Sequence, residues 1–127
     1  MDKKEIAKKI YVVCIKILSI LHTHGNHDWD RGFDRFIYVS GYLSRQDDKD
    51  AAKELISGVG TIYGGMGSFA DGGYGGEYDK LRDELPFLID KLEDAYGLSP
   101  FVGEYTVDKA GKVNYKWFCK NDQKKTK

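Results

Sequence analysis

The chain repeats apolar residues at steps of three and four positions over four stretches, which is the period of one face of an α-helix. The stripe is widest in the first stretch, where Val12, Ile15 and Ile20 add to it, so we expect that helix to be buried on more than one side. The expected helices cover residues 3–22, 28–45, 48–58 and about 77–96. Gly58 or Gly60 is expected to end the third of them.

Aspartates and one proline are expected to shape the ends and the course of these helices. Asp28 is a candidate N-cap of the second helix, and Asp47 or Asp48 can cap the third. Pro86 lies inside the fourth helix and lacks the amide hydrogen of an ordinary residue, so we expect a kink near residues 82–86. The alternative is a pair of helices that break at Glu84–Leu85.

After Gly97 the sequence changes to β-branched and aromatic residues, which favour strands. Two such segments flank the turn-like sequence Asp108-Lys109-Ala110-Gly111, which predicts a β-hairpin over about residues 101–119 that packs on the helices. The Lys-rich residues 122–127 are predicted to be disordered. Together these patterns predict one mainly α domain over residues 1–121, a four-to-five-helix bundle with a glycine-rich loop and a C-terminal hairpin.

Nine of the chain's 15 glycines fall within residues 58–76, GVGTIYGGMGSFADGGYGG. Glycine loses the most backbone entropy on ordering, so we expect no helix here but a folded loop in which Tyr63, Met66 and Phe69 reach the core. No Gly-Lys-Ser/Thr triplet is present, and the GMGSFA match to a dinucleotide fingerprint lacks a surrounding βαβ unit. An anion-binding nest formed by Gly72 to Gly76 is the alternative, although nearby carboxylates already supply the capping charge of the next helix.

The 127 residues carry 20 basic and 20 acidic side chains, but the charge is unevenly spread. Residues 1–25 carry +3, residues 26–108 carry −9 and residues 109–127 carry +6. An acidic body between basic ends suits a basic protein partner better than it suits nucleic acid. No apolar run is long enough to span a membrane, and two distant cysteines indicate a reducing compartment, so we expect a cytoplasmic protein.

Four residues of metal-ligating types, His22, His24, His27 and Asp28, fall within one short segment. They lie at a helix end and in a short loop, and neither cysteine is an obvious further ligand from a separate segment. We interpret the histidines as surface residues and predict no bound metal. A weak metal-binding or pH-sensitive site is the alternative.

No catalytic set is evident in the sequence. Cys14 is buried by pattern, and Cys119 has Lys116 and Lys120 beside it but no histidine that spacing would pair with it. Ser68 lacks the Gly-x-Ser-x-Gly elbow of serine hydrolases. We therefore predict no enzymatic activity and no cofactor.

Aromatic residues are abundant, with nine tyrosines, six phenylalanines and two tryptophans, so not all of them can be core residues. Tyrosine beside carboxylates is typical of protein-binding surfaces. The candidate partner contacts lie at the end of the glycine-rich segment and the start of the fourth helix: Asp71, Tyr74, Glu77, Tyr78, Asp79 and Asp83.

Residues 62–71, Ile-Tyr-Gly-Gly-Met-Gly-Ser-Phe-Ala-Asp, resemble the motif of a bacterial family of short proteins. In that family an aromatic residue precedes Gly-Gly-Met-Gly-Ser-Phe-Asn-Asp, and another helix follows. The chain departs from it at Ala70, where asparagine is usual, and at residues 72–76, where apolar residues usually follow. The resemblance covers about residues 5–98.

The family is similar to immunity proteins of contact-dependent or polymorphic toxin systems, and it carries no catalytic residues to transfer. The resemblance therefore implies a protein that binds and neutralises a cognate toxin domain, expected to be a nuclease, by covering its active site. The alternative is a small-molecule- or anion-binding domain, or an enzyme, that uses the glycine-rich loop 58–76.

Overall fold

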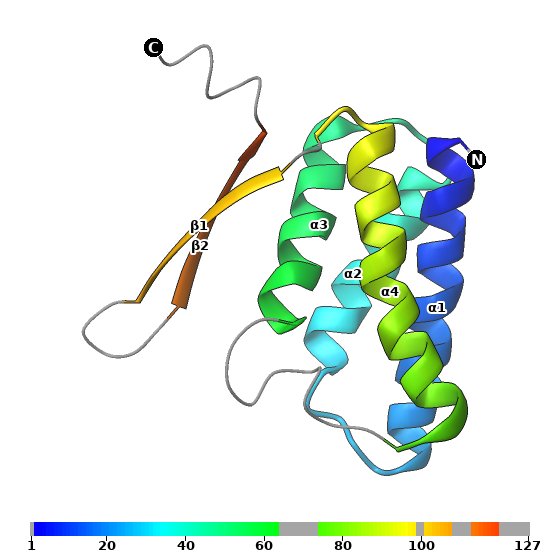
Figure 1. The fold of residues 1–127 in the computed structure, drawn as a ribbon. Helices are drawn as coiled ribbons and strands as arrows, with labels where there is room; N and C mark the ends of the chain where they lie inside the picture. Colours follow the sequence, from blue (N-terminus) through cyan, green and yellow to red (C-terminus); the bar gives the residue numbers. More distant parts are fainter. Residues whose placement is uncertain (1, 64–73, 99–100, 108–112, 120–127) are drawn as a thin grey trace.

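The computed structural model describes residues 2–63 and 74–98 in full and the backbone of residues 101–107 and 113–119. The helices are α1 (Lys3–Thr23), α2 (Asp30–Leu43), α3 (Lys49–Tyr63) and α4 (Gly76–Ala95). They run alternately down and up, with α1 packed on α2 and α4, and α3 packed on the same two helices (Figure 1). The prediction of a mainly helical protein is confirmed.

The buried face of α1 follows the predicted stripe. Its residues Ile10, Cys14 and Ile17 are fully buried. Val12 and Ile15, however, are each 40% exposed, so the prediction that they widen the buried stripe is wrong. The first turn is capped by Asp2, whose Oδ1 accepts a hydrogen bond from the backbone amide of Glu5 at 2.8 Å.

The third helix is longer than predicted. It runs through Gly58 and Gly60 to Tyr63, although the sequence predicted that one of these glycines would end it and that residues 58–63 would belong to a loop. Gly58 lies directly against the ring of Phe36 on α2, and Val59 is buried in the core. Close packing and apolar burial therefore outweigh the low helix propensity of glycine here. The predicted cap is present, since Asp48 Oδ1 accepts a hydrogen bond from the amide of Ala51 at 3.1 Å.

The fourth helix continues through Pro86 as one element, so the alternative of two separate helices is wrong. Pro86 has no amide hydrogen to donate to the carbonyl of Arg82, four residues earlier. The hydroxyl of Tyr63 on α3 donates to that carbonyl instead, at 2.7 Å. Gly75 and Gly76 precede or begin the helix with φ angles of 74° and 52°, a left-handed conformation that favours glycine.

The second helix begins two residues later than predicted, at Asp30, and its N-cap is Trp29, which makes no side-chain capping bond. Asp28 is not the cap. Its backbone amide donates to the side-chain oxygen of Asn26 at 3.0 Å, which forms a local turn between α1 and α2.

Strands β1 (Phe101–Val107) and β2 (Val113–Cys119) are paired antiparallel, with Tyr105 opposite Tyr115. The predicted packing of this hairpin on the helices depends on side chains that lie outside the described residues. The predicted turn at 108–111, the tail at 122–127 and most of the glycine-rich segment, residues 64–73, also lie outside them. Within residues 2–63 and 74–98, no helix combines the length and apolarity that crossing a membrane requires.

Candidate functional site

The predicted partner contacts at the start of α4 are only partly accessible. Tyr74 is 41% exposed and Glu77 is exposed, but Tyr78 is 3% exposed and is a core residue. The prediction of Tyr78 as a contact is corrected accordingly, because its ring packs inward with the apolar stripe of α4. Asp71 lies outside the described residues.

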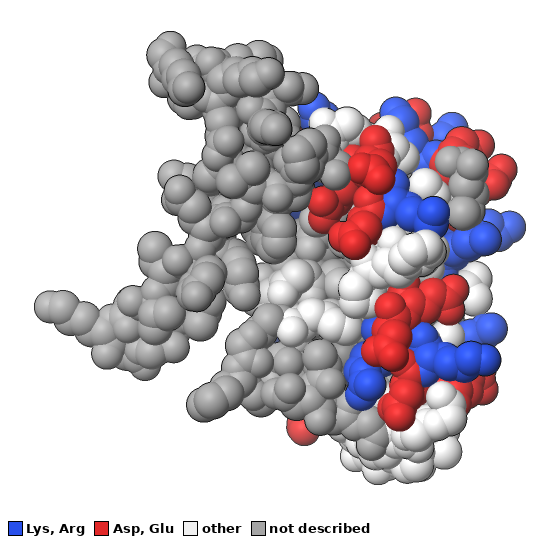
Figure 2. Space-filling model, viewed as in Figure 1, with Lys and Arg blue, Asp and Glu red and all other residues white. Residues whose placement is uncertain are grey.

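The two other predicted acidic contacts, Asp79 and Asp83, both pair with one cation. The guanidinium of Arg82 lies 3.7 Å from Asp79 Oδ1 and 3.6 Å from Asp83 Oδ1. Asp79 also accepts a hydrogen bond from the backbone amide of Gly75 at 3.3 Å, at the N-terminal end of the helix. On the face drawn in Figure 2, Asp and Glu side chains lie beside Lys and Arg, so the start of α4 does not present a surface of one sign.

Tyr74 joins the end of the glycine-rich segment to the connection between α1 and α2. Its ring stacks on the imidazole of His24, with centroids 4.0 Å apart and planes 6° apart. Its hydroxyl accepts a hydrogen bond from the side-chain amide of Asn26 at 3.2 Å. The sequence singled out Tyr74 and His24 separately but gave no sign that they meet.

Beside this contact, the end of α1 and the start of α2 bring two histidines onto one carboxylate. His22 Nε2 lies 2.6 Å from Asp30 Oδ1, and His27 Nδ1 lies 3.1 Å from Asp30 Oδ2. The hydrogen bond from His22 is the main reason that the pKa of Asp30 is lowered. The sequence singled out His22 and His27, together with His24 and Asp28. In the structure the carboxylate is that of Asp30, and His24 is occupied by its stack on Tyr74.

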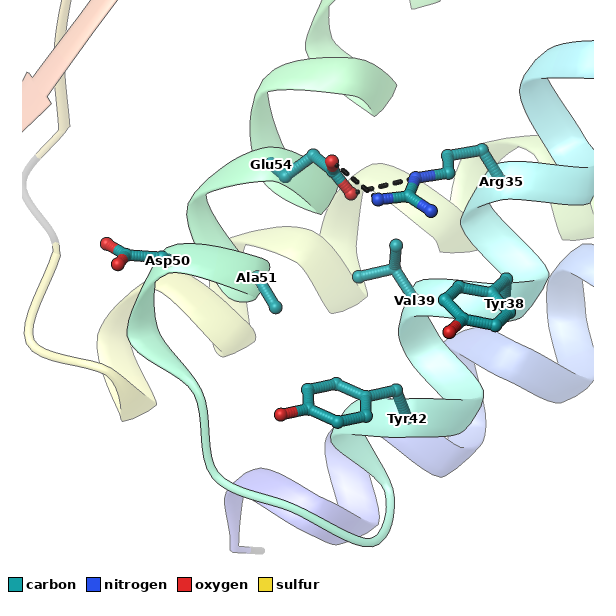
Figure 3. A pocket seen from close by; sticks show the side chains of 7 residues that line it. All are labelled: Arg35, Tyr38, Val39, Tyr42, Asp50, Ala51 and Glu54. Carbon is teal, nitrogen blue, oxygen red and sulfur yellow. Dashed lines mark hydrogen bonds and ion pairs between the residues drawn. The ribbon is translucent and has the colours of Figure 1, made fainter.

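A groove of about 300 Å³ lies between α2 and α3 (Figure 3). Arg35 crosses one end, where its Nε and Nη2 donate to the two carboxylate oxygens of Glu54 at 3.1 and 2.8 Å. Its guanidinium also lies 5.4 Å from the centroid of the Tyr38 ring, which is 67% exposed. The lining residues are Arg35, Tyr38, Val39, Tyr42, Asp50, Ala51 and Glu54.

The other end of this groove is fixed by Tyr42. Its hydroxyl donates to Asp48 Oδ2 at 3.1 Å, and this hydrogen bond is the main cause of the raised pKa of the Tyr42 phenol. The sequence did not indicate this groove, because most of its residues are partly or fully exposed positions of α2 and of the first turns of α3. Only the packing of α2 on α3 brings them together.

A second groove, of about 410 Å³, lies between α1 and α4. Its apolar floor includes Val12 and Leu81, and its rim includes Lys8, Lys16 and Glu84. Here too, the rim mixes both signs of charge.

Cys14 is not available as a nucleophile. Its thiol is fully buried, and burial raises its pKa to about 12, so the reactive thiolate is not populated near neutral pH. The other nucleophiles considered from the sequence, Ser68 and the side chain of Cys119, lie outside the described residues.

No family model matches the chain, and no curated protein or solved structure matches it significantly.

Proposed function

We propose that the chain is a cytoplasmic immunity protein, not an enzyme, that binds a cognate bacterial toxin domain and neutralises it by covering the active site. The observation that carries the proposal is the exposure of Tyr38. This large aromatic side chain is two-thirds exposed at the edge of the α2–α3 groove. The identity of the partner class comes from the motif resemblance at residues 62–71. We propose that the C-terminal hairpin, residues 101–119, is part of the folded immunity protein.

The α2–α3 groove has the composition of a protein-binding hot spot. Val39 and Ala51 supply an apolar floor, while tyrosine and arginine, the residue types enriched in hot spots, stand at its edge. Arg35 is held by both oxygens of Glu54 and lies over the Tyr38 ring, so both side chains are ordered before a partner arrives. Preorganisation of this kind lowers the entropy lost on binding.

The charge of the chain favours a basic partner. Residues 26–108, which contain α2, α3 and α4, carry −9. A nuclease domain presents a cationic cleft to its substrate, so an acidic protein would be steered toward it and would associate quickly at low salt. The groove itself contributes the carboxylate of Asp50, since the carboxylate of Glu54 is paired with Arg35.

The experiment is a growth-rescue assay with the toxin domain encoded beside this gene. Wild-type protein should restore growth, and Tyr38→Ala should weaken binding to the purified toxin domain by at least roughly tenfold, as expected for a hot-spot tyrosine. Phe87→Ala is the matched control, because Phe87 is also an exposed aromatic residue, 59% exposed, but lies on α4 with the amine of Lys91 over its ring. This control should rescue fully.

Two other outcomes distinguish an error in the proposed contact surface from an error in the proposed function. If Glu77→Lys abolishes rescue while Tyr38→Ala does not, the immunity role stands and the contact surface is the start of α4. If wild-type protein neither rescues cells from a neighbouring toxin nor binds it, the proposed function is wrong.

A further inference from the structure

We propose that His22, His27 and Asp30 form a binding site for a divalent transition-metal ion of the Zn²⁺ class. The ligand atoms would be His22 Nε2, His27 Nδ1 and a carboxylate oxygen of Asp30, with water in the remaining position. This site lies at the opposite end of α2 from Tyr42 and does not depend on the proposed immunity function.

The three side chains already converge. Their ligand atoms all lie within 4.8 Å of one another, and the two imidazole rings are tilted by 37° with centroids 4.6 Å apart. In a tetrahedral zinc site with bonds of about 2.0 to 2.1 Å, ligand atoms are separated by roughly 3.3 to 3.5 Å. Small side-chain rotations therefore bring the present distances of 2.6 and 3.1 Å, measured to Asp30, to those of a metal site.

The backbone holds these residues in place without a metal. His22 lies in the last turn of α1 and Asp30 in the first turn of α2, so the packing of α1 on α2 fixes the positions of both. His27 lies in the connection, which is closed by the turn at Asn26 and by the contact of Asn26 with Tyr74. A site held in this way loses little conformational freedom when an ion binds.

The ligand types select the metal. Two imidazoles and one carboxylate suit zinc, nickel, cobalt or copper, whereas magnesium and calcium require oxygen ligands. All three side chains are partly open to solvent, with exposed fractions of 42% for His22, 63% for His27 and 36% for Asp30. Three protein ligands with an open fourth position resemble zinc sites that keep a water or bind a substrate.

A different interpretation explains the same distances. Asp30 could serve only as a hydrogen-bond acceptor for two imidazoles, while its charge stabilises the N-terminal end of α2. Metal binding distinguishes the two interpretations. A metal site must bind Zn²⁺ or Co²⁺ in preference to Mg²⁺, and it must lose affinity for the ion when either imidazole is removed.

The test uses the full chain without an affinity tag, stripped of metal and titrated with Co²⁺ and with Zn²⁺. We expect one ion per chain, visible absorption bands of four-coordinate Co²⁺, and no competition from Mg²⁺. His22→Gln and His27→Gln should each weaken binding at least tenfold, and Asp30→Asn should weaken it similarly, because removing a direct ligand should cost no less than the roughly 10- to 100-fold lost with an outer-shell partner.

His24→Gln is the matched control, because His24 belongs to the same connection but stacks on Tyr74 outside the cluster. It should bind Co²⁺ within about twofold of wild type, and far-UV circular dichroism should show that every variant retains its helices. Even a weak imidazole site should be occupied at about 100 µM Zn²⁺. The proposal is therefore overturned if wild type binds no ion at that concentration. It is equally overturned if the His22 and His27 variants bind as well as wild type, or if His24→Gln loses as much affinity as they do.

Discussion

Gly58 is a point of close approach between α3 and α2. A Cβ atom built there would lie 2.8 Å from Cε1 of Phe36, whose ring is buried and meets Phe33 edge to face at 5.4 Å. Gly32, on α2, differs in one respect. A Cβ there would lie 4.0 Å from Phe36 Cζ, which is an ordinary van der Waals contact.

These two glycines give opposite predictions for the same substitution. Gly32→Ala should stabilise the protein by about 0.5 to 1 kcal/mol, because alanine is the better helix former. Gly58→Ala should destabilise it by about 1 to 3 kcal/mol, because the buried ring of Phe36 must move. Urea denaturation of both variants measures the difference. A stabilised Gly58→Ala variant would show that α3 and α2 are not in close contact there.

Glu93 is a buried carboxylate in the last turn of α4. Burial is the main cause of its raised pKa, and the charges of Asp90 and Asp94 add to the effect. Among the described residues, no hydrogen bond or ion pair is found for its side chain. The carboxyl group therefore favours its protonated form in the folded protein, with a pKa raised from 4.5 to about 7.

This shift predicts how stability depends on pH. Because the folded protein binds the Glu93 proton more tightly than the unfolded chain, the contribution to stability is complete below about pH 4.5 and is lost as the pH rises to about 7. Glu93→Gln cannot ionise, so its advantage over wild type should grow across this range and reach about 1 to 2 kcal/mol at pH 8. Denaturation at pH 5 and pH 8 measures it, with Glu84→Gln on the exposed side of α4 as the control. Parallel curves for wild type and Glu93→Gln would contradict the prediction.

At the level of elements, α3 compensates for a defect in α4. Pro86 leaves the carbonyl of Arg82 without its usual helical partner, and the hydroxyl of Tyr63 takes that place at 2.7 Å. The Tyr63 side chain is partly buried, and this burial raises the pKa of its phenol, which keeps the hydroxyl protonated as a donor. The final turn of α3 is therefore tied to the middle of α4.

A double-mutant cycle tests this link. Tyr63→Phe should cost about 1 to 2 kcal/mol in the wild-type background, because a partly buried carbonyl loses its donor. In a Pro86→Ala background the amide of residue 86 can bond to the Arg82 carbonyl, so the same change should cost about 0.5 kcal/mol or less. Chemical denaturation of the four proteins gives the coupling energy, and equal costs in both backgrounds would refute the role of Tyr63.

The sequence predicted the four helices, and it placed the ends of α1 and α4 to within one residue, but it did not predict where α3 ends or how the helices contact one another. The periodicity of apolar residues identified α1 to α4, because most of each buried stripe lies within one element. The extension of α3 to Tyr63 could not be predicted, because it depends on Phe36 of a different helix. His24 lies outside the cluster of His22, His27 and Asp30 because its ring stacks on Tyr74, which is 50 residues further along the chain.

For the whole molecule, the central fact is that the helices close a ring of contacts. Each helix packs on its two neighbours, and α1 is in contact with both α2 and α4 (Figure 1). The sequence offered a metal site at His22 and His27 as an alternative, but it did not place Asp30 in that site and did not indicate the α2–α3 groove, because each depends on residues from two helices of this ring. A ring of this kind should unfold as one unit, since removing any helix exposes the faces of two others.

This cooperativity can be tested by making the same substitution, isoleucine to alanine, at a buried and at an exposed position of α1, Ile17 and Ile15. Ile17 is fully buried, so Ile17→Ala should cost about 2 to 5 kcal/mol, whereas Ile15, at 40% exposed, should lose less than about 1 kcal/mol on the same change. Each variant is unfolded in a Trp117→Phe background, where fluorescence reports on Trp29 at the start of α2 and circular dichroism reports on all the helices. We expect the two signals to change together at a lower midpoint in Ile17→Ala, because α2 cannot keep its packing once α1 is lost. If the fluorescence of Trp29 changes at a denaturant concentration different from that of the helical signal, then α1 and α2 unfold separately, and the four helices do not form a single cooperative core.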